Sequence, residues 1–246
     1  MFALRTLGFA SLVAFSFSLV ACSGGGIESK SPEERVATVQ SAVKSPTGTV
    51  DATSAAVVLE GSQSVELYNS MTFLNDIFGQ ASDAKCLSGS GTNGKVDVSC
   101  ATSGKATGEV SFTASVNATA AASDVIFSMT LSNVCQDGKC LDGSMAAQIH
   151  SSAAGSKVTV QGSFDMTAGG ATKHGDWGIV VESGEGSSSV QLVTFDDAGA
   201  SYVLSASASV DGSGSVTIKG ANGEFACSYD AGGEAGSCTG AGEFKW

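Results

Sequence analysis

The chain has 246 residues, with 12 Lys and Arg against 24 Asp and Glu, which gives a formal net charge of −12 at pH 7. A chain this acidic repels nucleic-acid phosphates and anionic lipid head groups, so nucleic-acid binding is excluded. Only 15% of the residues are charged, and apolar residues alternate with polar ones through most of the chain, which excludes a charged disordered protein.

The first 22 residues have the features of an export signal. Arg5 is the only early positive charge, and an apolar run follows over residues 7–20. This run is too short to span a bilayer comfortably. It leads into four residues that matter for the location of the protein, namely Leu19, Val20, Ala21 and Cys22.

These four residues resemble the lipobox of bacterial lipoprotein precursors, and each matches the family pattern; the resemblance covers residues 1 to about 26. It implies that residues 1–21 are removed as a signal peptide and that Cys22 receives a diacylglycerol thioether and an acylated amino group. Acyl chains bind membrane with about 0.8 kcal/mol per buried methylene, so Cys22 would hold the protein durably. In the resembling family an Asp after the cysteine often marks inner-membrane retention, so Ser23 favours the outer membrane. The resemblance leaves open whether the protein faces the periplasm or the cell surface.

A tether and a short helix are expected to follow the anchor. Residues 22–30 are rich in Gly and Ser without periodicity and predict a flexible tether. Ser31 is a natural N-cap, Pro32 suits the first helical position, and Glu34 completes a capping box. We therefore expect a helix from Pro32 to about Lys44.

A second helix is predicted within the N-terminal helical segment, residues 31–83. Residues 50–60 are ambiguous between strand and helix because their apolar run has no clear period. Residues 65–78 instead show an apolar stripe with helical spacing, formed by Leu67, Met71, Leu74 and Phe78. Amphipathic helices normally bury such a stripe, so we expect it to pack on the sheet that follows.

Residues 84–246 are predicted to form an antiparallel β domain. The apolar period changes to two, for example over residues 110–116, 125–131 and 190–194, and Gly-containing turns separate the runs. The pattern predicts about ten to twelve strands with no room for crossover helices. The expected fold is therefore mainly β with a short N-terminal helical segment, an antiparallel meander that closes as a β-barrel or a sandwich.

The chain end raises the alternative of a membrane-spanning β-barrel. Such barrels often end in an aromatic residue after alternating apolar positions, as in Phe244-Lys245-Trp246. Two aromatic girdles would need more than the two Trp and three Tyr of this chain, so a soluble body is the preferred interpretation.

Six cysteines remain after Cys22, and an even number in an exported chain favours disulfides. Counting outward from the Asp-Gly turn places Cys135 opposite Cys140, and counting outward from residues 232–233 does the same for another pair. A third pair brackets the glycine-rich residues 89–94. The predicted disulfides are Cys86–Cys100, Cys135–Cys140 and Cys227–Cys238.

Few residues offer catalytic or metal-binding chemistry. Residues 89–94 match a dinucleotide fingerprint by letter, but their context predicts a hairpin loop. His174 and Asp176 would share one face if they lay on a strand, where a metal or proton-relay role is conceivable; a solvent-facing turn is the preferred interpretation. Asp196 and Asp197 lack the EF-hand spacing and are interpreted as an exposed turn.

The leading hypothesis is a non-enzymatic, lipid-anchored outer-membrane protein whose β domain binds a partner or contributes to the envelope, with no cofactor. Its contacts would come from loops and from exposed aromatic residues such as Trp177, Tyr202 and Tyr229. The opposing hypothesis is a hydrolase or a ligand carrier that uses a barrel mouth near His174 and Asp176. An enzyme would need titratable groups that converge in one pocket.

Overall fold

The computed structural model describes residues 30–51, 85–90, 92–119, 121–184, 187–196, 198–208, 213–230, 236–240 and 244–245. The predicted signal peptide, nearly all of the predicted tether and the second predicted helix lie outside these residues.

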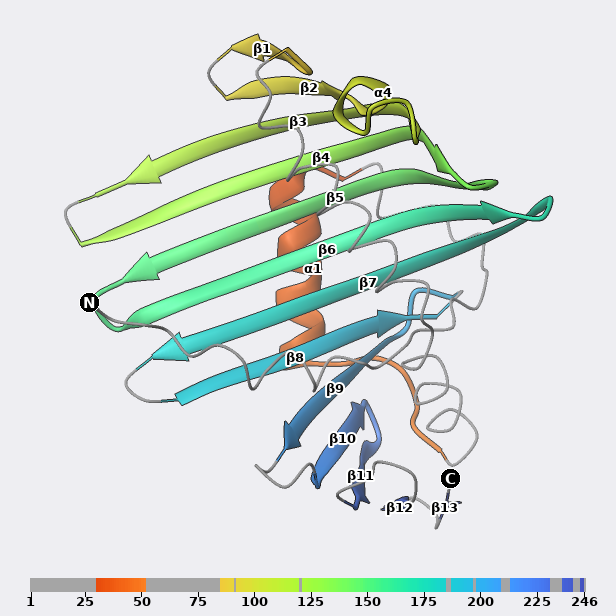
Figure 1. Cartoon of the computed structure of the whole chain (residues 1–246). Helices are drawn as coiled ribbons and strands as arrows, with labels where there is room; N and C mark the ends of the chain where they lie inside the picture. Colours follow the sequence, from red (N-terminus) through yellow and green to blue (C-terminus); the bar gives the residue numbers. More distant parts are fainter. Residues whose placement is uncertain are drawn as a thin grey trace.

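The described residues form one wide sheet with one helix packed across it and a second, four-residue helix (Figure 1). The helix α1 spans Pro32–Lys44, as predicted, and both halves of the capping box between Ser31 and Glu34 are present. Val36, Val39 and Ala42 are its buried apolar residues. The sequence therefore determines both the start of this helix and the side that it buries.

The strands form a single antiparallel meander in which each strand pairs with the next in sequence. The mainly β class and the meander order confirm the prediction. The order runs from β1 to β13, and these two end strands do not pair in the described structure, so the sheet stays open and is not closed into a barrel or split into a sandwich. The thirteen strands are β1 Leu87–Ser90, β2 Asn93–Asp97, β3 Thr107–Ala118, β4 Ala122–Gln136, β5 Lys139–Ser152, β6 Gly155–Ala168, β7 Ala171–Gly184, β8 Ser187–Phe195, β9 Ser201–Ala208, β10 Gly214–Gly220, β11 Gly223–Tyr229, β12 Gly236–Thr239 and β13 Phe244–Lys245.

Helix α1 crosses the strands on one face of the sheet, behind β4 to β8 in the view of Figure 1. Val39 packs over Gly178 of β7, where a Cβ atom would come within 2.5 Å of a Val39 methyl group. Arg35 is only 4% exposed and donates to the Gln161 side chain and to Ser144. The helix is therefore held both by apolar packing, in which Val39 and Ala42 cluster with valines of the sheet, and by a buried guanidinium.

The chain passes from this face to the opposite one directly after α1. Thr47 hydrogen-bonds Ser201 at the start of β9, and Gly48 accepts from Ala221 in the β10–β11 turn. Val50 then packs with Leu204, Ile218 and Phe225, which lie on the other side of the sheet. Residues 46–51 thus wrap around the end of the sheet.

Two of the predicted disulfides are present. Cys135 and Cys140 are register partners flanking Asp137 (φ 52°) and Gly138 (φ 77°), whose left-handed backbones form the predicted turn. Cys86 and Cys100 are also bonded.

The local geometry around Cys100 differs from the expectation. Leu87 pairs with Val96 and Ser90 with Asn93, so Cys100 lies beyond the paired part of the hairpin. A short helix α4, Val98–Ala101, brings it back to Cys86. Asp97 caps α4 by accepting from the Cys100 amide, so the alternating pattern at Val98 ends in a helical turn instead of a strand.

The third predicted disulfide stays a prediction that the register supports. Cys227 is disulfide-bonded, and the β11–β12 register places Cys238 directly opposite it.

Candidate functional site

The face of the sheet opposite α1 carries a continuous set of uncharged residues, here called the uncharged face. Because side chains alternate along a strand and register partners share a face, the pairing of β3 to β9 aligns them in rows across the sheet. Row 1 is Val116, Val125, Ile149, Val158, Val181 and Val190; row 2 is Ala114, Phe127, Ala147, Val160, Ile179, Leu192 and Leu204; row 3 is Phe112, Met129, Met145, Gly162, Trp177, Thr194 and Tyr202; row 4 is Val110, Leu131, Gly143, Phe164 and Gly175.

Burial decreases steadily from row 4 to row 1. Val110 and Leu131 in row 4 are buried in one cluster with Val98 and Ala101 of α4, which closes this end of the face. Phe127 and other row 2 residues are only partly buried. In row 1, Val116 is 64% exposed, Ile149 42% and Val190 38%. The uncharged face therefore opens to solvent along row 1.

Row 3 contains two buried polar atoms without a hydrogen-bond partner. Trp177 is 3% exposed, lies against Gly162 and packs at a tilt on Phe164, yet its Nε1 donates to nothing. The Oγ1 atom of Thr194, its register partner on β8, is equally unsatisfied. Each such group costs about 1–3 kcal/mol when buried. Phe and Val would fill similar space without this penalty, so the two polar atoms are a feature that folding alone does not explain.

Trp177 and Tyr202 differ from the exposed aromatic residues expected of a loop-based binding site. Trp177 is buried because it lies in the interior of β7 and not in a loop. Tyr202 is half-buried and donates to Asp196; burial, together with the charge of Asp196, raises the pKa of its phenol. Tyr229 ends β11, but its side chain lies outside the described part of the structure.

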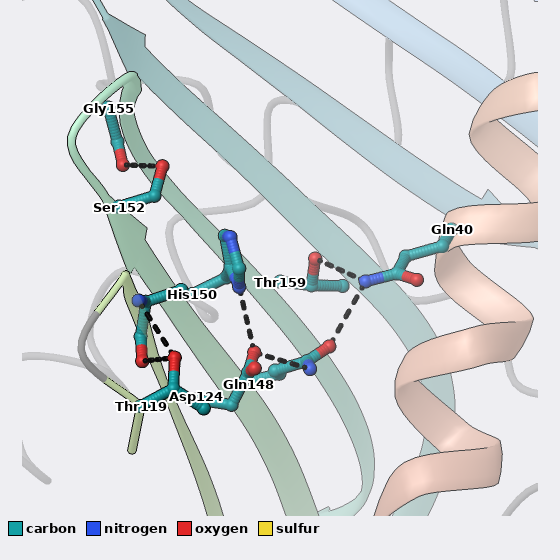
Figure 2. A network of polar contacts seen from close by, with 9 residues as sticks. Gln40, Thr119, Asp124, Gln148, His150, Ser152, Gly155 and Thr159 are labelled. Carbon is teal, nitrogen blue, oxygen red and sulfur yellow. Dashed lines mark hydrogen bonds and ion pairs between the residues drawn. The ribbon is translucent and has the colours of Figure 1, made fainter. Parts of the chain in front are cut away.

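The face under α1, here called the polar face, holds both histidines beside a buried apolar cluster of Val180, Val193 and Val203. Figure 2 shows a chain of contacts from the helix into the sheet: Gln40 donates to Gln148 and Thr159, and Gln148 donates to Asp124. Asp124 also contacts His150, with 2.9 Å between Oδ1 and Nδ1. This network joins α1 to β4, β5 and β6 through two side-chain amides, the Thr159 hydroxyl and the Asp124–His150 contact.

His174 lies between two carboxylates. Its Nδ1 is 2.8 Å from Asp165 Oδ1 on β6, and its Nε2 is 3.4 Å from Asp176 Oδ2. The expectation of a solvent-facing turn at residues 173–176 is wrong, because these residues lie inside β7 and pair with β6. His174 and Asp176 therefore share one face, as two residues that are two apart on a strand must.

The carboxylates favour the charged imidazolium of His174. Burial alone lowers the pKa of this side chain, but the hydrogen bonds to Asp165 and Asp176 and the charges of both carboxylates together outweigh burial and raise the pKa above its ordinary 6.5. This interaction contributes stability that is fully present below pH 6.5 and is lost as the pH rises through the folded-state pKa.

Substituting His174→Gln is therefore expected to flatten the pH dependence of stability. The urea midpoint of the natural protein should fall between about pH 6 and about pH 8, and the variant should lose less over the same interval. Equal pH dependence in both proteins would contradict the assigned ion pairs, and an NMR titration of the His174 ring gives the pKa directly.

The predicted metal role of His174 and Asp176 remains a prediction. Among the described residues, no group of three or more His, Cys, Asp and Glu is arranged to hold a metal ion. The Oδ1 atom of Asp176 is buried without a partner, while both ring nitrogens of His174 already face carboxylates. His174 and Asp176 thus form, with Asp165, a cluster of ion pairs on the polar face.

The acidic pair at the β8–β9 turn also has a structural explanation on its described side. Asp196 Oδ1 accepts from the amides of Ala198 and Ala200, which makes it a turn-forming residue. The exposed turn expected at Asp196 is confirmed. Asp197 lies outside the described residues.

The uncharged face could have been read only partly from the sequence. The alternating apolar residues of rows 1 and 2 are visible there, but the sequence pattern does not show that the described helix covers the polar face instead. The unsatisfied atoms of row 3 need the register and the burial of the folded chain.

Comparison with known proteins adds no family. The chain matches no protein-family model, no curated protein and no solved structure. No helix in the described part of the chain is long and apolar enough to cross a membrane.

Proposed function

We propose that this is a non-enzymatic, lipid-anchored protein of the bacterial outer membrane, whose acidic β domain binds a ligand through the uncharged face. The anchor is Cys22, by resemblance of residues 19–22 to a lipobox. Whether the domain faces the periplasm or the cell surface is left to experiment.

The observation that supports binding is the exposure of row 1. Three large apolar side chains, Val116, Ile149 and Val190, face solvent in one register row. Single exposed apolar residues are ordinary, but a contiguous row beside a partly buried second row is typical of an interaction site. A purely structural role in the envelope would give no reason to keep this row apolar.

The arrangement of titratable groups supports a non-enzymatic role. His150 and His174 lie on the polar face, each engaged by a carboxylate of its own strand or its neighbour's. The uncharged face has no titratable side chain in rows 1, 2 and 4 and only the Tyr202 phenol in row 3. The two histidines and the uncharged face are thus on opposite sides of the sheet. The hydrolase alternative at His174 and Asp176 is therefore not preferred.

The anchor is tested by labelling with radioactive palmitate in a bacterium that processes lipoproteins. The natural chain should incorporate label and fractionate with the outer membrane, whereas Cys22→Ala should remain unlabelled and keep its signal peptide. Cys86→Ala is the matched control, since it also removes a cysteine and should still be labelled. An unlabelled natural chain would reject the anchor.

The side of the membrane is decided by protease treatment of intact cells. Digestion of the natural chain only after the outer membrane is permeabilised places the domain in the periplasm, and digestion without permeabilisation places it on the surface.

A further inference from the structure

We infer that the ligand of the uncharged face is a neutral acyl lipid, whose hydrocarbon chain lies across rows 1 and 2 and whose carbonyl oxygen accepts a hydrogen bond from Trp177 Nε1. This inference rests on the proposed function and names the class of ligand. It is carried by the geometry of the rows, by the unsatisfied atoms of row 3 and by the distribution of charge.

The rows fit a long hydrocarbon chain. Row 2 is open across neighbouring strands from β3 to β8, since its β9 member Leu204 is covered by Val50. Adjacent strands lie about 4.8 Å apart, so the open part of the row extends for more than 20 Å. Its partly buried side chains, such as Phe127, Val160 and Ile179, have contact area left to offer. An acyl chain on row 2 would also cover the exposed valines of row 1. Burial of apolar surface gains about 25 cal/mol per Å².

The unsatisfied polar atoms of row 3 indicate which chemical group of the ligand lies beside them. Trp177 Nε1 can only donate a hydrogen bond, and Thr194 Oγ1 can donate or accept one. Both atoms are unsatisfied. Trp177 and Thr194 form the register pair of row 3 that lies directly beside the Ile179–Leu192 pair of row 2. The complementary group is an acceptor next to a hydrocarbon chain, which is what an ester or amide carbonyl of an acyl lipid provides.

The charges favour a neutral head group over an anionic one. The four rows contain no charged side chain, and an ionised carboxylate is costly to bury without a cation. The chain as a whole has a net charge of −12, which adds a long-range repulsion. A free fatty acid would therefore bind worse than its ester.

The experiment uses the full-length chain produced in cells that process lipoproteins. Cells are given one of three photoactivatable, alkyne-tagged probes with the same C16 chain: a monoacylglycerol, a fatty acid and an alkane without a carbonyl. After irradiation, the protein is purified and its labelled peptides are mapped. The monoacylglycerol should label peptides of β4 to β8 at least about tenfold more than the other two probes, because one hydrogen bond of about 1.4 kcal/mol corresponds to tenfold in affinity.

Two matched variants test the assigned residues. Trp177→Phe removes Nε1 and keeps an aromatic ring, so labelling by the monoacylglycerol should fall about tenfold to the level of the alkane. Val190→Glu puts a charge into the exposed row 1 and should abolish labelling, whereas Ser189→Glu, on the neighbouring exposed residue of the other face, should leave it unchanged. Circular dichroism checks that each variant is folded.

The outcomes separate this inference from the proposed function. Equal labelling by all three probes, or full labelling of Trp177→Phe, would reject the carbonyl acceptor while leaving binding at the uncharged face in place. Equal loss of labelling in Val190→Glu and Ser189→Glu, or no labelling of the natural protein, would reject acyl lipids as ligands. The N-terminal peptide from the same samples reports acylation of Cys22 separately, so a failed anchor is distinguished from a failed ligand.

Discussion

Arg35→Met is expected to lower the free energy of unfolding by about 3 kcal/mol. The guanidinium is buried between α1 and the sheet and donates to Gln161 Oε1 and to both oxygens of Ser144. Methionine fills most of the space of the arginine stem, but it leaves these acceptors buried without donors, at about 1–3 kcal/mol for each unsatisfied group. Urea denaturation measures the change.

The control lies on the same helix. Ala37 lies two residues after Arg35 on the exposed side of α1, so Ala37→Met should change the stability by less than about 0.5 kcal/mol. Gln161→Met combined with Arg35→Met should cost less than the sum of the two single changes, because an acceptor is removed together with its donor. Additive costs would show that the two side chains do not depend on each other.

The second large effect is expected where α1 touches β7. Gly178→Ala should cost about 2 kcal/mol, because the added Cβ atom would lie 2.5 Å and 2.6 Å from the two methyl groups of Val39. Val39→Ala should also cost about 2 kcal/mol through the cavity that it leaves. Chemical denaturation of both variants gives these values.

The double variant makes this prediction specific. With Val39→Ala in place, the methyl groups that clash are gone, so Gly178→Ala should then cost much less than it does alone. A coupling of at least about 1 kcal/mol is expected. If the two costs simply add, the helix does not sit on β7 through this contact.

The local features of the fold follow from the sequence, because short-range chemistry determines them. Ser31, Pro32 and Glu34 specify the start of α1, and the left-handed backbone at Asp137 and Gly138 follows from turn preferences. The Cys135–Cys140 disulfide follows from counting outward from this turn. In each case the determining residues lie within a few positions of the feature.

Other features depend on partners far along the chain. Lys-His-Gly-Asp at residues 173–176 has the composition of a turn, yet pairing with β6 holds it in a strand, because cross-strand contacts outweigh local preference. Closure of the sheet depends on strand tilt and stagger, which no single strand encodes. Arg35 and Gln161 are separated by 126 positions, so the position of α1 on the sheet also depends on contacts that are distant in the sequence.

The site was the least predictable part. Trp177 was expected to be an exposed aromatic residue, but it is buried inside β7, and its unsatisfied Nε1 is evident only once its neighbours are in place. The sequence shows which residues are apolar. It does not show which of them lack a covering element within the described fold.

The open sheet brings a hazard that its end strands reduce. Exposed strand edges have free amide and carbonyl groups that can recruit a second chain. Here β1 has four residues and β13 two, against 12 to 15 in β3 to β7. Such short end strands offer a neighbouring molecule few backbone groups to pair with. Even at high concentration, the molecules are therefore expected to stay separate and not to associate edge to edge through their sheets.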